Sequence, residues 1–248
     1  MNLLHVVILS VIEGITEFLP ISSTGHLILT AKLLDIQTSD FLKTFEIAIQ
    51  LGAIMAVVVL YFKRFLDLNL NLKLAVALIP TALVGFILYP FIKVYLLGSS
   101  RVTLVSLFIG GLVLIFFNKE NKGKIIGVKE ALLIGIFQAI SVVPGVSRAA
   151  ATIIGGLLVG ANRKTATEFS FLLAVPTMIA ASGYDIYKSA GILNPQNLRL
   201  LALSFILSFI FALLAVKFLV SYVERHDFKA FGVYRIALAV VYFLFADS

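Results

Sequence analysis

Two acidic residues lie inside the first apolar segment of the chain, at Glu13 and Glu17. Residues four apart project from one face of a helix, where like charges repel each other unless a positive group lies between them. A divalent cation or an arginine would supply that charge. The alternative is one protonated glutamate that is hydrogen-bonded to a neighbouring helix, although ionisable groups in such segments are costly and by default functional.

Hydroxyl groups and a histidine follow these acids, in the motif Pro20-Ile-Ser-Ser-Thr-Gly-His26. We expect Ser22 to cap a new half-helix whose first turn carries Ser23 and Thr24. Capping alone explains Ser22 as well as a catalytic role does. The free N–H groups and positive dipole end of such a half-helix form a natural seat for a phosphate. Ser23 and His26 share a helix face, on which a hydroxyl nucleophile and a proton-transfer partner can cooperate.

A second polar group stands at Ser147 and Arg148, directly after the pair Pro144-Gly145. Arg148 is the only arginine in the apolar run from 130 to 160. Its charged, fork-shaped guanidinium calls for a substrate phosphate or a protein carboxylate, and a purely structural ion pair with Glu17 is the alternative. We expect Ser147 and Thr152 to complete a second phosphate-binding half-helix end.

The elements that position these groups belong to an integral membrane protein. Of the 248 residues, 60% are hydrophobic and only 13% are charged, and the mean hydropathy is +1.07, whereas about a quarter of the residues of soluble proteins are charged. The basic residues behind the net charge of +7 lie in short loops between apolar spans, which argues against nucleic acid as a partner. The absence of cysteine excludes disulfides, thiolate metal sites and cysteine catalysis.

The apolar stretches predict an all-α polytopic membrane protein, with a single membrane domain over residues 1–248. Two stretches, 3–30 and 130–160, are interrupted by proline, glycine and hydroxyl residues. Irregular backbone at membrane depth needs protein or water around it, so we predict a re-entrant helix pair in each. Six further stretches are apolar enough to predict transmembrane helices, at 44–62, 74–97, 102–117, 166–187, 198–220 and 231–246.

The two halves of the chain repeat in order, at an offset of 124 residues that relates Pro20 to Pro144. Each unit, about 1–120 and about 125–248, then consists of one broken hairpin and three spans. Because three is an odd number of crossings, the second unit must be inverted relative to the first.

Loop charge predicts the orientation of the chain in the membrane. The loops at 63–73, 118–129, 161–165 and 221–230 hold eleven Lys and Arg residues, against five in the loops and termini of the other side. The richer side is expected to be cytoplasmic, which places both termini outside.

Glu13-x-x-x-Glu17, the motif Pro20 to His26 and the motif Pro144 to Thr152 together closely resemble the undecaprenyl-diphosphate phosphatase (bacitracin resistance protein) family. The resemblance extends over nearly the whole chain. It implies a multi-pass cell-membrane enzyme that hydrolyses a polyprenyl diphosphate to the monophosphate and inorganic phosphate, which recycles the lipid carrier for cell-envelope glycan and peptidoglycan synthesis. It also implies inverted repeats, two re-entrant helix pairs and a site that opens to the outer face.

The same resemblance implies roles for individual residues. Glu13 and Glu17 match an acidic motif linked to a divalent cation, Mg²⁺ or Ca²⁺. Ser23 matches the proposed nucleophile, His26 the proton-transfer residue and Arg148 the phosphate-binding arginine.

Ala149 departs from the family pattern, which usually has a serine there. The hydrogen bond of that serine must be absent, or supplied by Ser147 or Thr152. Metal identity, prenyl length and oligomeric state, with a homodimer as one alternative, are left open by the sequence.

Two mechanisms and one rival function also stay open. Either Ser23 attacks the terminal phosphorus while His26 takes or relays the proton, or a metal-activated water attacks and Ser23 only binds phosphate. The rival is a transporter or flippase for a phosphorylated lipid or an anion, because inverted repeats with facing half-helices are transporter architecture. Two acids, a hydroxyl, a histidine and an arginine in two short motifs exceed what anion binding requires, which favours the phosphatase.

Overall fold

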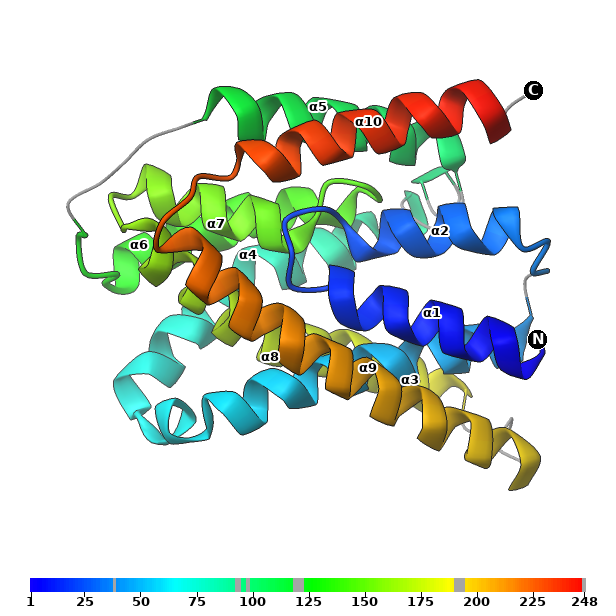
Figure 1. The fold of residues 1–248 in the computed structure, drawn as a ribbon. Coiled ribbons are helices and arrows are strands. Elements are labelled where there is room, and N and C mark those ends of the chain that lie inside the picture. The colour runs from blue at the N-terminus through cyan, green and yellow to red at the C-terminus, as the bar shows by residue number, and fades with distance from the viewer. Residues whose placement is uncertain (38, 92–94, 97–98, 118–122, 190–194, 247–248) are drawn as a thin grey trace.

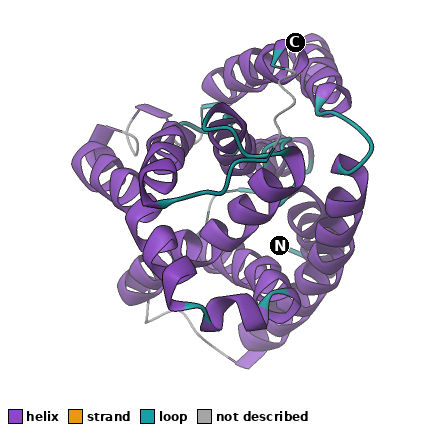
Figure 2. Ribbon diagram, turned by 90° about the vertical axis from the view of Figure 1, so that its left-hand side faces the viewer, coloured by secondary structure: helices purple, strands orange, loops and turns teal. Residues whose placement is uncertain are grey.

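The computed structural model describes residues 1–37, 39–91, 95–96, 99–117, 123–189 and 195–246. Within these ranges the regular elements are helices joined by loops, and no strand is formed (Figure 1, Figure 2). The predicted all-α architecture is therefore confirmed for the described part of the chain.

The first half contains helices on both sides of the first predicted break and then three longer helices. Their bounds are α1 Leu3–Thr16, α2 Ser23–Leu33, α3 Asp40–Leu60, the 3₁₀ helix η1 Phe62–Leu66, α4 Leu68–Phe91 and α5 Ser100–Phe116. The second half follows the same order. Its elements are α6 Val128–Ala139, the 3₁₀ helix η3 Ile140–Val142, α7 Arg148–Leu158, α8 Arg163–Ser189, α9 Pro195–Val223 and α10 Lys229–Ala246.

Two helical hairpins, α1–α2 and α6–α7, form at the two stretches that the sequence marks as broken. In Figure 1 they extend from opposite ends of the molecule, and their connecting loops meet near its middle. The second helix of each hairpin is capped by a serine with left-handed backbone, Ser22 at φ 72° and Ser147 at φ 74°. The predicted capping role of Ser22 is confirmed, and Ser147 caps α7 in the same way.

The hairpins correspond element for element at an offset of 125 residues, one more than the sequence predicts. Helices α2 and α7 both have 11 residues, and their first residues, Ser23 and Arg148, are 125 positions apart. The alignment of Pro20 with Pro144 is shifted by one residue because the second loop reaches its capping serine one residue later after the proline. Ser23 and Arg148 therefore occupy equivalent places in the two hairpins.

Each hairpin is held by a helix from the other half of the chain. Helix α1 packs against α9, whereas α6 packs against α4. Both contacts are close, because a Cβ at Gly14 on α1 would lie 2.6 Å from the carbonyl oxygen of Ser208, and a Cβ at Gly135 on α6 would lie 2.1 Å from that of Ala77. The two halves thus interlock, while α5 and α10 pack together as a pair.

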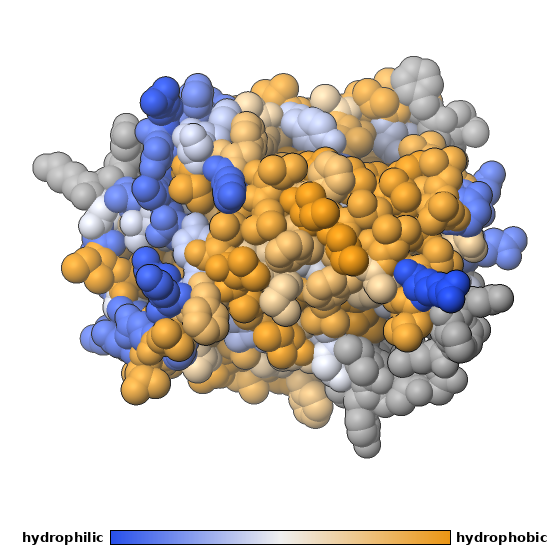
Figure 3. Space-filling model, turned by 60° about the horizontal axis from the view of Figure 1, so that its bottom comes forward, coloured by the Kyte–Doolittle hydropathy of each residue, from blue (hydrophilic) through white to orange (hydrophobic). Residues whose placement is uncertain are grey.

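An apolar surface surrounds this core. In Figure 3 hydrophobic residues form a broad band across the middle of the face shown, and hydrophilic residues gather at both ends. Three described helices are long and apolar enough to cross a bilayer by length and composition, over Leu68–Leu88, Arg163–Gly183 and Leu198–Val223. The protein is therefore a helical, multi-pass membrane protein, and the count of six spans stays a prediction.

The beginning of α1 and the end of α10 lie at the same end of the molecule (Figure 1). This arrangement agrees with two termini on one side of a membrane. Which side that is stays a prediction, and Lys119 and Lys122, two of the lysines behind it, lie outside the described residues.

Candidate active site

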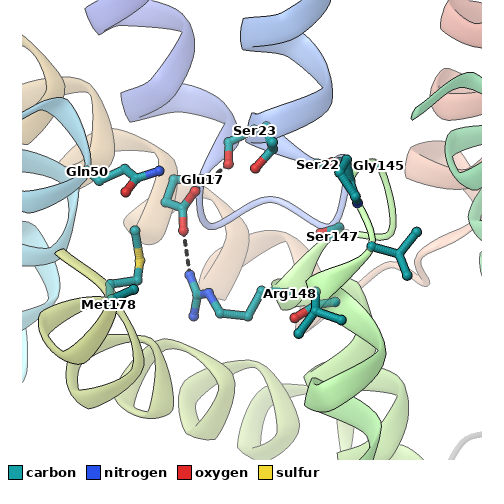
Figure 4. Close-up of a pocket in the computed structure, with 14 residues that line it drawn as sticks. Glu17, Ser22, Ser23, Gln50, Gly145, Ser147, Arg148 and Met178 are labelled. Atoms are coloured by element: carbon teal, nitrogen blue, oxygen red, sulfur yellow. Dashed lines mark hydrogen bonds and ion pairs between the residues drawn. The ribbon is translucent and has the colours of Figure 1, made fainter. Parts of the chain in front are cut away.

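A cavity of about 270 Å³ lies where the two hairpin loops meet. The first hairpin contributes Glu17 and residues 22–24, and the second contributes residues 141–145, 147 and 148. Gln50 from α3 and Met178 from α8 complete the wall on the other side (Figure 4). The two motifs that the sequence analysis singled out thus form one site.

Glu17 joins the two hairpins at the centre of this cavity (Figure 4). Its Oε1 accepts a hydrogen bond of 2.7 Å from Nη2 of Arg148, and its Oε2 accepts one from the hydroxyl of Ser23. Only 7% of the Glu17 side chain and 12% of the Arg148 side chain are exposed. Such a buried, charge-assisted contact holds the carboxylate in one orientation, with each oxygen assigned to one partner.

Arg148 has further contacts that fix its position. Its Nη1 donates to the carbonyl oxygen of Ser170 on α8 at 3.4 Å, and its guanidinium lies 5.9 Å from the centroid of the Phe18 ring. A guanidinium has five N–H donors, so these contacts leave donors for an anion in the cavity.

The first turns of α2 and α7 border the same cavity. The hydroxyl of Ser22 accepts a hydrogen bond from the N–H of Gly25 at 3.3 Å, and that of Ser147 accepts one from the N–H of Ala150 at 3.2 Å. Thr24, also predicted to bind phosphate, is exposed and lines the cavity. Two positive helix ends therefore face one space, which is the arrangement expected for an anion site.

The predicted cooperation of Ser23 with His26 is not found in this structure. Nδ1 of His26 lies 2.7 Å from the carbonyl oxygen of Ser22, and its Nε2 lies 2.8 Å from the hydroxyl of Tyr234 on α10. Because a carbonyl only accepts, Nδ1 carries a proton. The Ser23 hydroxyl instead turns back toward α1 and Glu17, so the two side chains point to different neighbours.

Thr152 also makes contacts that the sequence does not predict. Its hydroxyl lies 2.6 Å from that of Ser170 and donates to the carbonyl oxygen of Arg148 at 2.8 Å. The side chain is buried and does not line the cavity. Its hydrogen bonds thus join α7 to α8, its phosphate-binding role stays a prediction, and Ala149 on the same helix is equally buried.

Glu13 is fully buried one helical turn behind Glu17, outside the cavity lining. Neither of its carboxylate oxygens accepts a hydrogen bond within the described part of the chain. Glu17 and Glu46 of α3 are close enough to interact with it electrostatically. A buried carboxylate beside two other acids calls for a cation or a proton.

The residues fit a divalent cation only in part. Carboxylate oxygens suit Mg²⁺ and Ca²⁺, and Mg²⁺ sites commonly use one or two carboxylates together with water and substrate phosphates. The orphaned oxygens of Glu13 supply one such ligand, and Glu17 supplies a second that is already shared with Ser23 and Arg148. Among the described residues no group of three or more His, Cys, Asp or Glu side chains is placed to hold a metal.

Sequence reasoning missed two residues of α10 that contact the hairpins. Tyr234 bonds His26, and Arg235 bonds both connecting loops. Arg235 carried a usable signal, because it is a charged residue inside a predicted apolar span, near its start. Tyr234 carried none, because tyrosine is ordinary at a membrane-exposed helix surface.

The fold and the cavity together define a class of protein, a helical membrane protein in which two hairpins bring a carboxylate, a hydroxyl and a guanidinium to one cavity. The family described as "Bacitracin resistance protein BacA" matches residues 6–241, and the chain belongs to this family.

Full-length relatives agree with this membership. The chain is 51% identical to an undecaprenyl-diphosphatase of Aquifex aeolicus, with 96% of each chain covered. It is 50% identical to one of Wolinella succinogenes, with 100% of this chain and 99% of the relative covered. It is 47% identical to one of Thermus thermophilus, with 96% and 95% covered.

Proposed function

We propose that this chain hydrolyses undecaprenyl diphosphate to undecaprenyl monophosphate and inorganic phosphate, and so returns the lipid carrier to cell-envelope glycan synthesis. Family membership and full-length relatives named undecaprenyl-diphosphatase support this activity. The observation that carries it is the bridge made by Glu17, which holds a hydroxyl and a guanidinium from opposite hairpins in one cavity.

The diphosphate is proposed to enter the cavity while its prenyl tail stays in the bilayer. Arg148 and the first turns of α2 and α7 neutralise the terminal phosphate, and Ser22, Thr24 and Ser147 border it. A site of this kind works by positioning and by electrostatic stabilisation, which supply most of the catalysis in phosphoryl transfer.

In the proposed reaction the Ser23 hydroxyl attacks the terminal phosphorus. A bond forms between Oγ of Ser23 and phosphorus, and the bond from phosphorus to the bridging oxygen breaks, which releases the polyprenyl monophosphate. Glu17 is the group placed to take the Ser23 proton, because its Oε2 accepts that hydrogen bond. Water then hydrolyses the phosphoserine. In an alternative route, water attacks directly and Ser23 only binds phosphate.

His26 keeps a proposed role in proton transfer, although its ring does not contact the Ser23 hydroxyl directly. Its ring is bonded to the carbonyl of Ser22, the residue next to the nucleophile, and to Tyr234. It therefore holds the start of α2 in place and gives a polar path from the site toward α10.

Glu13 and Glu17 are the residues proposed to hold a divalent cation, Mg²⁺ or Ca²⁺. When bound, such a cation would neutralise the two carboxylates and the charge of the diphosphate. The unsatisfied oxygens of Glu13 support this assignment. Without that charge, two buried carboxylates lie one turn apart, and among the described residues the guanidinium of Arg148 pairs with Glu17 and not with Glu13.

The hairpins are proposed to be re-entrant and the two halves to be inverted repeats. The matching hairpin frames, their approach from opposite ends and the shared end of α1 and α10 support this arrangement (Figure 1). With both termini outside, the cavity is proposed to open to the outer face of the membrane.

The direct test is phosphate release from undecaprenyl diphosphate by the purified protein in detergent, with and without EDTA. We expect release that stops with EDTA and returns with Mg²⁺ or Ca²⁺. No release under any metal condition would contradict the phosphatase and favour transport. Phosphate release that is unaffected by EDTA would support the phosphatase activity but contradict the proposed cation.

A further inference from the structure

Arg235 of α10 is fully buried, and five backbone carbonyl oxygens surround its guanidinium. All five contacts are between 2.7 and 3.2 Å, and they match the five N–H donors that an arginine carries. Nε donates to Leu107, Nη1 to Pro20 and Val146, and Nη2 to Ser106 and Gly145.

These carbonyls come from three separate segments. Pro20 belongs to the loop of the first hairpin, Gly145 and Val146 belong to the loop of the second, and Ser106 and Leu107 belong to α5. A loop that interrupts a helix leaves carbonyl groups without helical partners, and lipid offers no donor to replace them. Arg235 supplies those donors. Its Nη1 atom by itself joins the two loops, because it donates to Pro20 in the first loop and to Val146 in the second.

The loops that Arg235 joins are short and lead directly into the reactive groups. Pro20 lies three residues before Ser23, and Val146 lies two residues before Arg148. Ser23 and Arg148 meet only through Glu17, so their spacing depends on how the two loops sit against each other. We infer that Arg235 is a positioning residue that sets the distance between the Ser23 hydroxyl and the Arg148 guanidinium for reaction.

Gly110 on α5 makes room for this guanidinium. A Cβ at position 110 would lie 2.2 Å from Nη2 and 2.7 Å from Cζ of Arg235. Alanine at Gly110 would therefore displace the guanidinium while the arginine and its charge remain. Gly85 on α4 offers a matched control, because a Cβ there meets nothing within 4 Å.

The inference rests on the proposed phosphatase activity for its kinetic arm. We expect Arg235→Lys, which keeps the charge but loses the five-donor fork, to lower kcat about 100-fold, the cost of a misplacement of about 1 Å, while KM changes little. Gly110→Ala is also expected to lower kcat, whereas Gly85→Ala should leave kcat unchanged. If wild-type protein releases no phosphate, the proposed function fails and this arm is replaced by the next.

A second arm measures loop geometry without any reaction. The chain has no cysteine, so Thr24→Cys and Ile140→Cys, both at exposed positions beside the loops, can carry nitroxide labels without background. Dipolar EPR should give a narrow distance distribution in the otherwise wild-type chain and in Gly85→Ala, and a broader one in Arg235→Lys and Gly110→Ala. A merely structural role predicts lower thermal unfolding temperature with unchanged kcat and unchanged label distances in the folded fraction, and that result would overturn the inference.

Discussion

The two helical hairpins have the same frame but carry different side chains at equivalent positions. At the start of the second helix the first hairpin has Ser23 and the second has Arg148. On the first helix, Glu13 is equivalent at the same offset to Gln138, and both side chains are fully buried. One hairpin therefore supplies the proposed nucleophile and the acids, and the other supplies the guanidinium of Arg148.

The buried amide of the second hairpin is satisfied by its neighbours. Nε2 of Gln138 donates to the hydroxyl of Thr81 on α4 at 2.9 Å, and the hydroxyl of Thr177 on α8 donates to its Oε1 at 3.4 Å. The Glu13 carboxylate at the equivalent place has no such partner in the described chain. The comparison indicates that Gln138 joins helices, whereas Glu13 lacks a hydrogen-bond partner among the described residues and is proposed to bind a cation.

The largest effect is expected at the first of these paired positions. Ser23→Ala removes the proposed nucleophile and should lower turnover by roughly 10⁴-fold or more. Phosphate release from undecaprenyl diphosphate measures it, with Ser10→Ala, another buried serine of the first hairpin, as the matched control. A large residual turnover would favour direct attack by water.

The second-largest loss of activity is expected at Arg148, the equivalent position in the second hairpin. Arg148→Lys keeps one positive charge but loses the planar fork that serves Glu17 and a phosphate, so kcat/KM should fall about 100-fold or more. Steady-state kinetics would show it, and Arg101→Lys at an exposed position should behave as wild type. If the lysine variant kept wild-type kcat/KM, a point charge would suffice and the fork geometry would be irrelevant.

Glu13→Gln gives the first hairpin the amide of the second. We expect cation affinity to fall about 10- to 100-fold, because the amide lacks the negative charge that binds a hard cation. Calorimetric titration of Mg²⁺ or Ca²⁺ into the purified protein reports this without relying on turnover. Unchanged affinity would remove Glu13 from the proposed cation site.

Gln138→Leu tests the satisfied amide of the second hairpin. The substitution leaves the half-buried hydroxyls of Thr81 and Thr177 with fewer partners and should lower the free energy of unfolding by about 1 to 3 kcal/mol, with kcat little changed. Thermal unfolding in detergent would report it. In a double-mutant cycle with Thr81→Val, additive effects would mean that the hydrogen bond is not energetically coupled.

The smallest effect is expected at the two capping serines. Ala at Ser22 or Ser147 loses the cap and is disfavoured at positive φ, so each should destabilise by about 1 kcal/mol, whereas Gly should cost only a few tenths. Unfolding temperatures of the four variants provide the measurement. The two hairpins should respond alike, and a clear difference between them would show that only one cap is structural.

The hairpins and the meeting of their loops could be predicted from sequence because a cluster of proline, glycine and hydroxyl residues interrupts a helix even where the surrounding run is apolar. The contact between Glu17 and Arg148 followed from the need of each charge for a partner. In contrast, the helix face shared by Ser23 and His26 did not predict their contacts, because neighbours from α1 and α10 decide where each side chain turns. The contact of Thr152 was not predicted for a similar reason, since its partner Ser170 belongs to another helix, α8.

Arg235 could have been suspected but not placed. Its position in an apolar span marks it as unusual, yet its partners are backbone carbonyls, which no side-chain pattern reveals. The one-residue shift of the repeat was likewise hidden, because Pro20 and Pro144 align well although the capping serines follow them at different distances.

The bond between Arg235 and the carbonyl of Pro20 spans 215 positions of the chain. Chains are synthesised and fold from the N-terminus, so the first hairpin is made long before Arg235 of α10. The contact that joins the first hairpin loop to Arg235 can therefore form only after α10 has been made.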